Sequence, residues 1–283
     1  MNKQNIFYAI GTLLCIAGLV LVLAFTSTTL NLIGAGLFIL GCVAGLMFTH
    51  APTIAWRELS SFFVSPIAYI LIAIYLLAVA WFFYVGVQSS YRAQMEQTFV
   101  IMTWLALFLC PLITMRLLAE EARLGTIETM VTAPITDFEL TIGKFIGAFL
   151  FFVILNVPTL VFVWVLAHSG TPDYGTIIAS YVGIILFGAL LVSVGLLVSA
   201  FTRNQVIAAF VSFVAMFMLF FFGIMGRSMA GMPGKVITYI GAATHYMDFT
   251  RGVILSQHVL YYVTLSAFFL FLAVRAVESH KWR

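Results

Sequence analysis

Eight apolar runs take up most of this sequence, and their length decides what the chain can fold into. Each run is long enough for a helix to cross the hydrocarbon core of a bilayer, which takes about 20 residues. The alternating ten-residue segments typical of a membrane β-barrel are absent from the sequence. The sequence therefore predicts an all-α integral membrane protein with about eight transmembrane helices. The predicted spans are Phe7–Phe25, Leu30–Phe48, Ile67–Val87, Thr98–Met115, Phe145–Ala167, Ile177–Ala200, Val206–Ile224 and Val259–Ala276.

Composition excludes several other classes of protein. Hydrophobic residues make up 63% of the 283 residues and charged residues only 8%, whereas a soluble domain carries about 25% charged residues. The formal net charge is +3, so no nucleic-acid partner is expected. Cys15, Cys42 and Cys110 all lie inside apolar runs, and their spacing indicates neither a disulfide framework nor a metal site.

The runs divide the chain into two parts. Residues 1–50 hold an N-terminal two-helix hairpin, and residues 51–283 hold six further spans. A cleaved signal peptide is the alternative for the first run, but a second run follows immediately, which favours a retained hairpin. An even number of spans places both termini on one side. That side carries nine Lys and Arg residues against four on the other, which predicts cytoplasmic termini.

A charged segment from Arg116 to Lys144 separates the fourth and fifth spans. Helical residues over Leu112–Leu124 would continue the fourth span into the cytoplasm, where Arg116 can pair with Glu120 and Glu120 with Arg123. Gly125 would end this helix. The orientation rule places the whole segment in the cytoplasm.

The second half of the segment carries further signals for helix ends. Thr126 can cap a short helix that Pro134 closes. Thr136 and Glu139 then form a capping box for a helix that runs into the fifth span. The segment is thus predicted to be a stiff connector, and the alternative is a solvated loop between two spans.

An amphipathic helix is predicted ahead of the third span, over Thr53–Val64. Its apolar side chains gather on one side, opposite the charged ones, which is typical of a helix lying in the membrane interface. The apolar side consists of Ala55, Leu59, Phe62 and Phe63, and the polar side of Arg57 and Ser61, with Glu58 at the flank and Trp56 near the membrane boundary. Ser65 would cap the next span, with Pro66 at its first position.

Two other regions leave alternatives open. The stretch Met225–Ser256 is either a re-entrant or interfacial hairpin or an ordinary outer loop, and there His245 and Asp248 form a small outer site or, by preference, are solvated loop residues. In the fifth span, Asn156 and Pro158 either line a pathway, because a proline frees a carbonyl group, or belong to a buried and locally hydrogen-bonded turn.

The charged segment resembles the cytoplasmic segment of ABC-2 type permeases, the membrane subunits of ATP-binding-cassette transporters. The resemblance covers Thr53–Ala276 in the order of its predicted elements. The residues of the segment are most similar to those of the gliding-motility-associated and copper-site-maturation branches. The resemblance implies that Gly125–Pro134 is a coupling helix that docks into an ATP-binding subunit and that Thr53–Val64 is an elbow helix. The matching residues are Glu120, Glu121, Gly125, Thr126, Glu128, Pro134, Glu139, Gly143 and Lys144. Of these, Glu120, Glu121 and Glu128 would meet basic residues of the partner.

The sequence also limits the chemistry of this chain. It contains no G-x-x-x-x-G-K-[ST] motif, so ATP and Mg²⁺ would be held by a separate subunit, and this chain carries no cofactor of its own. No acidic residue lies in the middle of a span, which disfavours an ion-coupled secondary transporter. The five histidines are scattered without metal spacing, so no catalytic residues are expected.

The expected function is therefore that of a permease in a bacterial inner membrane, which exports a substrate or transmits force when the partner hydrolyses ATP. The expected partners are an ATP-binding subunit, a second permease copy or paralogue, membrane lipid and a periplasmic or auxiliary subunit. A non-transporting membrane anchor is the alternative function.

Overall fold

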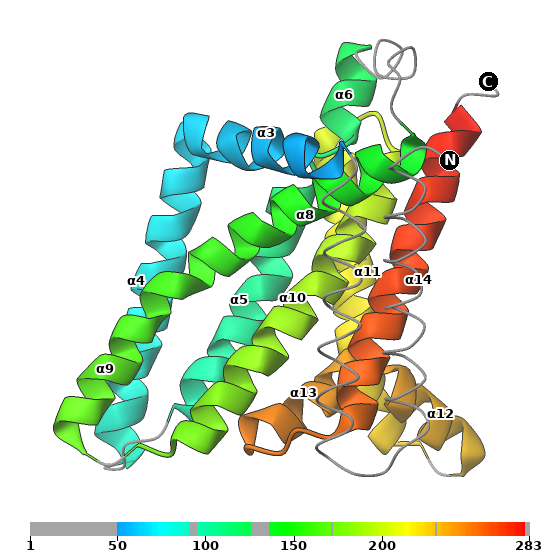
Figure 1. Cartoon of the computed structure of the whole chain (residues 1–283). Helices are drawn as coiled ribbons and strands as arrows, with labels where there is room; N and C mark the ends of the chain where they lie inside the picture. The colour runs from blue at the N-terminus through cyan, green and yellow to red at the C-terminus, as the bar shows by residue number, and fades with distance from the viewer. Residues whose placement is uncertain (1–49, 91–94, 126–135, 171, 230, 281–283) are drawn as a thin grey trace, which may run out of the picture.

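The computed structural model describes residues 50–90, 95–125, 136–170, 172–229 and 231–280, and every regular element in these ranges is a helix. Six segments are long and apolar enough to cross a membrane, and they run alternately up and down (Figure 1). The helices are α3 (Ala51–Val64), α4 (Pro66–Ser90), α5 (Glu96–Thr114), α6 (Ala119–Leu124), α8 (Asp137–Asn156), the 3₁₀ turn η1 (Val157–Thr159), α9 (Leu160–Ser169), α10 (Tyr174–Phe201), α11 (Gln205–Arg227), α12 (Met232–Ile240), α13 (Ala242–Thr250) and α14 (Ser256–His280).

The six spans predicted between Ile67 and Ala276 are confirmed, each within a longer helical segment. The observed segments extend beyond the predicted apolar runs into polar and charged residues, such as Glu96, Asp137 and Glu278. The two spans predicted over Phe7–Phe25 and Leu30–Phe48 lie outside the described residues. The C-terminal end of α14 lies at the same end of the bundle as α3 and α6 (Figure 1).

Helix α10 occupies the centre of the bundle and packs against α5, α11, α13 and α14. Its small residues allow this close packing. A Cβ atom added to Gly188 would collide with the ring of Phe152, and one added to Gly195 would collide with Thr114. Phe152 and Thr114 belong to α8 and α5, so glycines of α10 bring three spans into direct contact.

The fourth span continues to Leu124, as predicted, but a turn divides this segment into two helices. Helix α5 ends at Thr114, a turn covers residues 115–118, and α6 begins at Ala119. Pro111 removes a backbone donor from the last turn of α5. The Thr114 hydroxyl donates to the carbonyl of Cys110 at 2.9 Å. Local hydrogen bonds of this kind compete with helical ones.

The fifth span is interrupted near its middle, where α8 gives way to η1 and then α9. Asn156 is 4% exposed; its side chain accepts a hydrogen bond from the Tyr75 hydroxyl at 2.7 Å and donates one to the Phe152 carbonyl at 2.8 Å. These bonds match the alternative of a buried, locally bonded asparagine. Pro158 is exposed in η1, and the pathway that these two residues would line stays a prediction.

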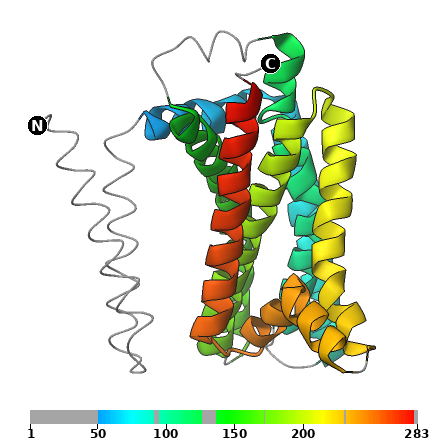
Figure 2. The same cartoon turned by 90° about the vertical axis from the view of Figure 1, so that its right-hand side faces the viewer.

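The stretch Met225–Ser256 folds into two short helices, α12 and α13, at the end of the bundle opposite α3 (Figures 1 and 2). They meet at Gly241, where a Cβ atom would collide with the backbone of Gly223 in α11. His245 is only 4% exposed, so its placement as a solvated loop residue is wrong. Whether the hairpin enters the membrane stays a prediction.

Candidate functional site

Helix α3 lies across the end of the bundle, roughly at right angles to the spans (Figure 1). Ala55, Leu59 and Phe62 are buried, and Phe63 is half-buried, so the predicted apolar side is confirmed. The ring of Phe62 stacks on that of Phe151 in α8, with 4.7 Å between the centroids. The polar side of the helix, with Trp56 and Arg57, is exposed, as an interfacial helix requires.

Two glycines on α8 set how closely α3 approaches it. A Cβ atom on Gly143 would lie 2.7 Å from the Cβ of Ile54, and one on Gly147 would lie 2.7 Å from the Cβ of Glu58. Glycines four residues apart lie on one face of a helix and let a second helix approach closely. The sequence Gly143–Gly147 is therefore the surface on which α3 rests, and Lys144 lies within it.

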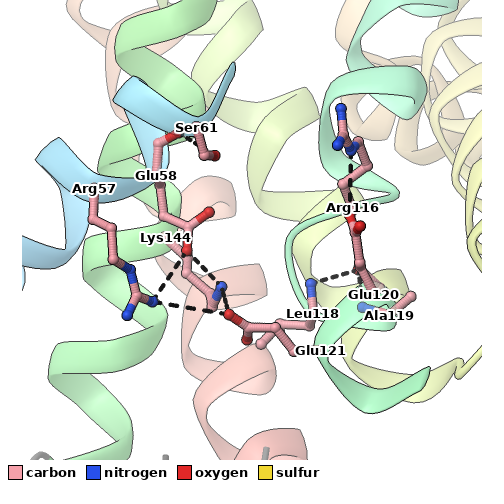
Figure 3. A network of polar contacts seen from close by, with 10 residues as sticks. Arg57, Glu58, Ser61, Arg116, Leu118, Ala119, Glu120, Glu121 and Lys144 are labelled. Carbon is pink, nitrogen blue, oxygen red and sulfur yellow. Dashed lines mark hydrogen bonds and ion pairs between the residues drawn. The ribbon is translucent and has the colours of Figure 1, made fainter. Parts of the chain in front are cut away.

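Lys144 connects three helices through its ammonium group (Figure 3). Its Nζ atom lies 2.8 Å from Oε1 of Glu58 in α3 and 2.7 Å from Oε1 of Glu121 in α6. The Lys144 side chain is 1% exposed, and those of Glu58 and Glu121 are 13% and 15% exposed. A buried cation is tolerated only when it is paired, so the position of Lys144 requires both carboxylates.

Arg57 adds a second cation at the rim of this group. Its Nη2 atom lies 3.5 Å from Oε1 of Glu58 and 3.9 Å from Oε1 of Glu121. Two cations thus face two carboxylates, and the group has no net formal charge. We call Arg57, Glu58, Glu121 and Lys144 the inner ion network. It ties α3, α6 and α8 to one another at a single point.

Helix α6 is held at both ends. The Ser199 hydroxyl, from the end of α10, accepts hydrogen bonds from the backbone N–H groups of Leu118 at 3.1 Å and Ala119 at 3.0 Å. Gly125 ends the helix with φ of 70°, the left-handed conformation that favours glycine. Both the start and the stop of α6 are therefore specified, and the predicted role of Gly125 is confirmed.

Arg116, in the turn before α6, makes the first of the two ion pairs predicted for this region. Its Nε atom lies 3.2 Å from Oε2 of Glu120, and its Nη1 atom donates to the Ser65 hydroxyl at 3.2 Å. The pair of Glu120 with Arg123 does not form among the described residues. Arg116 therefore links the start of α6 to the junction between α3 and α4.

The predicted capping box at the start of α8 is confirmed. The Thr136 hydroxyl accepts from the Glu139 N–H at 3.2 Å, and the Glu139 carboxylate accepts from the Thr136 N–H at 3.0 Å. The other oxygen of Glu139 accepts from the N–H of His50 at 3.2 Å, just before α3. One carboxylate thus fixes the beginnings of both α8 and α3.

The structure brings together nine of the predicted site residues around this end of the bundle: Trp56, Arg57, Glu58, Glu120, Glu121, Gly125, Glu139, Gly143 and Lys144. Thr126, Glu128 and Pro134 lie outside the described residues. Sequence reasoning missed Ser199 and Gly147. The Gly-x-x-x-Gly pattern over Gly143–Gly147 was a signal for Gly147. No local pattern indicates that Ser199, in an apolar helix, caps the distant helix α6.

Comparison with known proteins agrees with this layout. Among the described residues, no group of three His, Cys, Asp or Glu residues could hold a metal ion. No curated protein matches the chain. The family model described as "ABC-2 family transporter protein" matches residues 84–276, which is more than half of the chain. This protein, whose described residues include six helices long and apolar enough to cross a membrane, therefore belongs to the ABC-2 family of transporter proteins.

Proposed function

We propose that this chain is the membrane subunit of an ABC transporter and that α3, α6 and α8 receive movement from a separate ATP-binding subunit. The observation that carries the proposal is the inner ion network, because Lys144 holds these three helices together through buried charges. A family of transporter proteins implies an ATP-binding partner in general. The network supports the end of the bundle that carries α3, α6 and α8 as the place where the ATP-binding subunit acts on this chain.

The proposed path begins at residues 125–134, between α6 and α8. A displacement of this segment would move α6, which lies directly before it and is ended by Gly125. The ion pair of Glu121 with Lys144 would then move α8. Lys144 lies at the start of a spanning segment that runs from Asp137 to His168. Glu58 passes the same displacement to α3, which leads directly into the span α4. Two spans would therefore tilt together.

The remaining parts of the proposal follow from the family and the sequence. ATP and Mg²⁺ are bound by the partner, and this chain has no enzymatic activity of its own. Two membrane subunits pair in a bacterial inner membrane, with the α3 end in the cytoplasm and room for an outer auxiliary subunit. The narrower relationship to gliding-motility-associated and copper-site-maturation permeases rests on the residues of the charged segment alone.

Docking is tested by co-purification with the ATP-binding subunit. We expect Glu128→Arg to reduce the recovered partner by about tenfold, because a like charge in a desolvated contact costs more than about 1.4 kcal/mol. The matched control is Glu278→Arg, a charge reversal at an exposed carboxylate of α14, which should leave recovery unchanged. Equal recovery with Glu128→Arg and with the unaltered chain would show that residues 125–134 are not the docking segment.

Coupling is tested separately from docking. The triple variant Lys144→Met, Glu58→Gln, Glu121→Gln removes the network without leaving a buried charge. We expect it to retain the partner but to lose the stimulation of ATP hydrolysis that the membrane subunit provides. A chain that binds the partner and never alters its ATP hydrolysis, before or after these changes, would instead be a membrane anchor.

A further inference from the structure

A cavity of about 570 Å³ opens at the end of the bundle opposite α3, among the end of α11, helices α12 and α13, and the start of α14. Three cationic side chains line it: Arg227 from α11, Lys235 from α12 and Arg251 from the residue after α13. The sequence places only four Lys and Arg residues on this side. Three of them line one cavity, so the positive charge of this side is concentrated there.

These cations have no carboxylate to balance them. Among the described residues, Arg227, Lys235 and Arg251 take part in no ion pair, and the Arg227 guanidinium contacts the Met247 sulfur at 3.9 Å. Asp248 is the one acidic residue in the described lining, and its Oδ2 atom lies 2.9 Å from Nε2 of His258. The cavity therefore has a formal charge of +2 before any histidine is protonated.

Two buried histidines form the wall of the cavity beside these cations. His245 and His258 are 4% and 5% exposed, and their Nδ1 atoms lie 2.6 Å apart. Nε2 of His245 contacts the Tyr239 carbonyl at 2.9 Å, and Nε2 of His258 lies 2.9 Å from Oδ2 of Asp248. The ring nitrogens of the two histidines therefore contact each other and neighbouring oxygens, which leaves the three cations as the groups that can bind an anion.

The outer surface of α12 next to the cavity is apolar. Met232, Val236 and Tyr239 are 77%, 56% and 60% exposed, and Tyr239 also lines the cavity. A short helix with such a face and a cation between its apolar residues lies favourably at the boundary of a membrane. A molecule held in the cavity by its charge could therefore extend an apolar chain along α12.

We propose that this cavity binds the phosphate headgroup of an anionic amphiphile, whose apolar chain lies along α12. Arginine and lysine form charge-assisted hydrogen bonds with phosphate oxygens, and arginine can do so with two N–H groups at once. The inference concerns the end of the bundle away from the proposed docking segment, and it holds or fails independently of the ATP-binding partner.

The test measures binding of a fluorescent phosphatidylglycerol to the full-length chain in detergent, with any subunits that co-purify. A phosphatidylcholine carrying the same acyl chains is the comparison. We expect saturable binding of the phosphatidylglycerol, weakened about tenfold or more by the double variant Lys235→Gln, Arg251→Gln, because charge-assisted hydrogen bonds to phosphate are stronger than neutral ones. The matched control, Arg123→Gln with Arg203→Gln, removes two exposed arginines from the other end of the bundle and should leave binding unchanged.

Three results would overturn the proposal. Equal binding of phosphatidylcholine would show that the contact is only apolar. Equal weakening by the control variant would show that binding depends on net charge and not on this cavity. Displacement by glycerol 3-phosphate at the concentration of the lipid probe would assign the cavity to a small soluble anion, with no part for α12.

Discussion

The two ends of the bundle treat charge in opposite ways. At the end that carries α3, every member of the inner ion network has an opposite charge within 4 Å, and Lys144 is buried at the centre. At the end that carries α12 and α13, three cations share a cavity with one carboxylate. Neutralised charges fix helices relative to one another, whereas unbalanced charges leave a surface ready to bind an anion.

The comparison indicates that the two ends have different tasks. The α3 end satisfies its polar groups internally, through Ser199, Glu139 and Lys144, and gains stiffness. At the α12–α13 end, Arg227, Lys235 and Arg251 take part in no ion pair among the described residues. A stiff end suits the transmission of movement, and an end with unpaired cations suits the binding of an anion.

The largest effect is expected when one partner of the inner ion network is removed alone. Lys144→Met leaves the carboxylates of Glu58 and Glu121 with only the half-exposed Arg57 as a counter-charge, and we expect the free energy of unfolding to fall by about 3–5 kcal/mol. Denaturation of the purified protein in detergent measures this. The control Arg275→Gln, which breaks an exposed pair with Glu278, should cost only about 0–1 kcal/mol. Equal losses for the two variants would show that burial does not distinguish the network from a surface pair.

A smaller effect is expected when α3 is pushed away from α8. Gly147→Leu places side-chain atoms where Glu58 and the Ala55 carbonyl already lie, and overpacking of this kind costs about 1–3 kcal/mol. Gly86→Ala is the control, because a Cβ atom there meets its nearest neighbour at an ordinary 3.6 Å. Thermal unfolding measures both variants. An unchanged midpoint for Gly147→Leu would show that α3 is not held closely against α8.

Loss of the distant cap on α6 should cost less. Ser199→Ala leaves the N–H groups of Leu118 and Ala119 without an acceptor, which costs about 1–2 kcal/mol. Hydrogen exchange gives the sharper readout, since these two amides should exchange faster while those of α10 do not. Ser60→Ala, which removes an exposed hydroxyl from α3, should leave both amides protected. Protection of Leu118 and Ala119 in Ser199→Ala would contradict the assigned cap.

Acidification should have the smallest effect on the free energy of unfolding, and it should act at the α12–α13 end of the bundle. Burial lowers the pKa of His245, and the bond to the Tyr239 carbonyl opposes this lowering only in part; nearby His258 lowers the pKa further and Asp248 raises it. A lowered pKa means that the unfolded state takes up the proton first. The stability contributed by neutral His245 is therefore complete above its usual pKa of about 6.5 and is lost as the pH falls through the value in the folded protein.

Thermal unfolding between pH 7.5 and pH 5 measures this loss. The variant His245→Gln should remove the acid-sensitive part, whereas His168→Gln, at an exposed histidine of α9, should retain it. Two variants with the same pH dependence would exclude His245 as the responsible group. The inner ion network contains no histidine, so the stability that it contributes should not follow the titration of His245.

The fold follows largely from features that local sequence carries. Apolar runs predict the six described spans because a helix in lipid must satisfy its own backbone. The capping box of Thr136 and Glu139 and the stop at Gly125 were predictable because each depends on residues a few positions apart. The two sides of α3 were predictable for the same reason, from the spacing of Ala55, Leu59 and Phe62.

The parts that escaped prediction depend on contacts between distant segments. Glu121 was expected to meet a partner protein, yet it lies 2.7 Å from Lys144, 23 residues away; the expected contact with a partner stays a prediction. Ser199 caps a helix 80 residues away, and His245 meets His258 across the turn between α13 and α14. Such pairs require knowledge of which helices are neighbours, and apolar helices of similar composition do not specify their neighbours by pattern alone.

The turn at Val157–Thr159 divides the fifth membrane crossing into two rods placed end to end. The rod nearer α3, α8, carries Gly143, Lys144 and Gly147, while the other rod, α9, begins beyond the break. A uniform helix bends only by straining its whole hydrogen-bond ladder, but kinks concentrate at prolines. Here a bend would disturb mainly the side-chain bonds of Asn156 to Tyr75 and of Thr159 to Asn156. The fifth crossing can therefore bend at residues 157–159, and a small rotation of α8 need not displace α9.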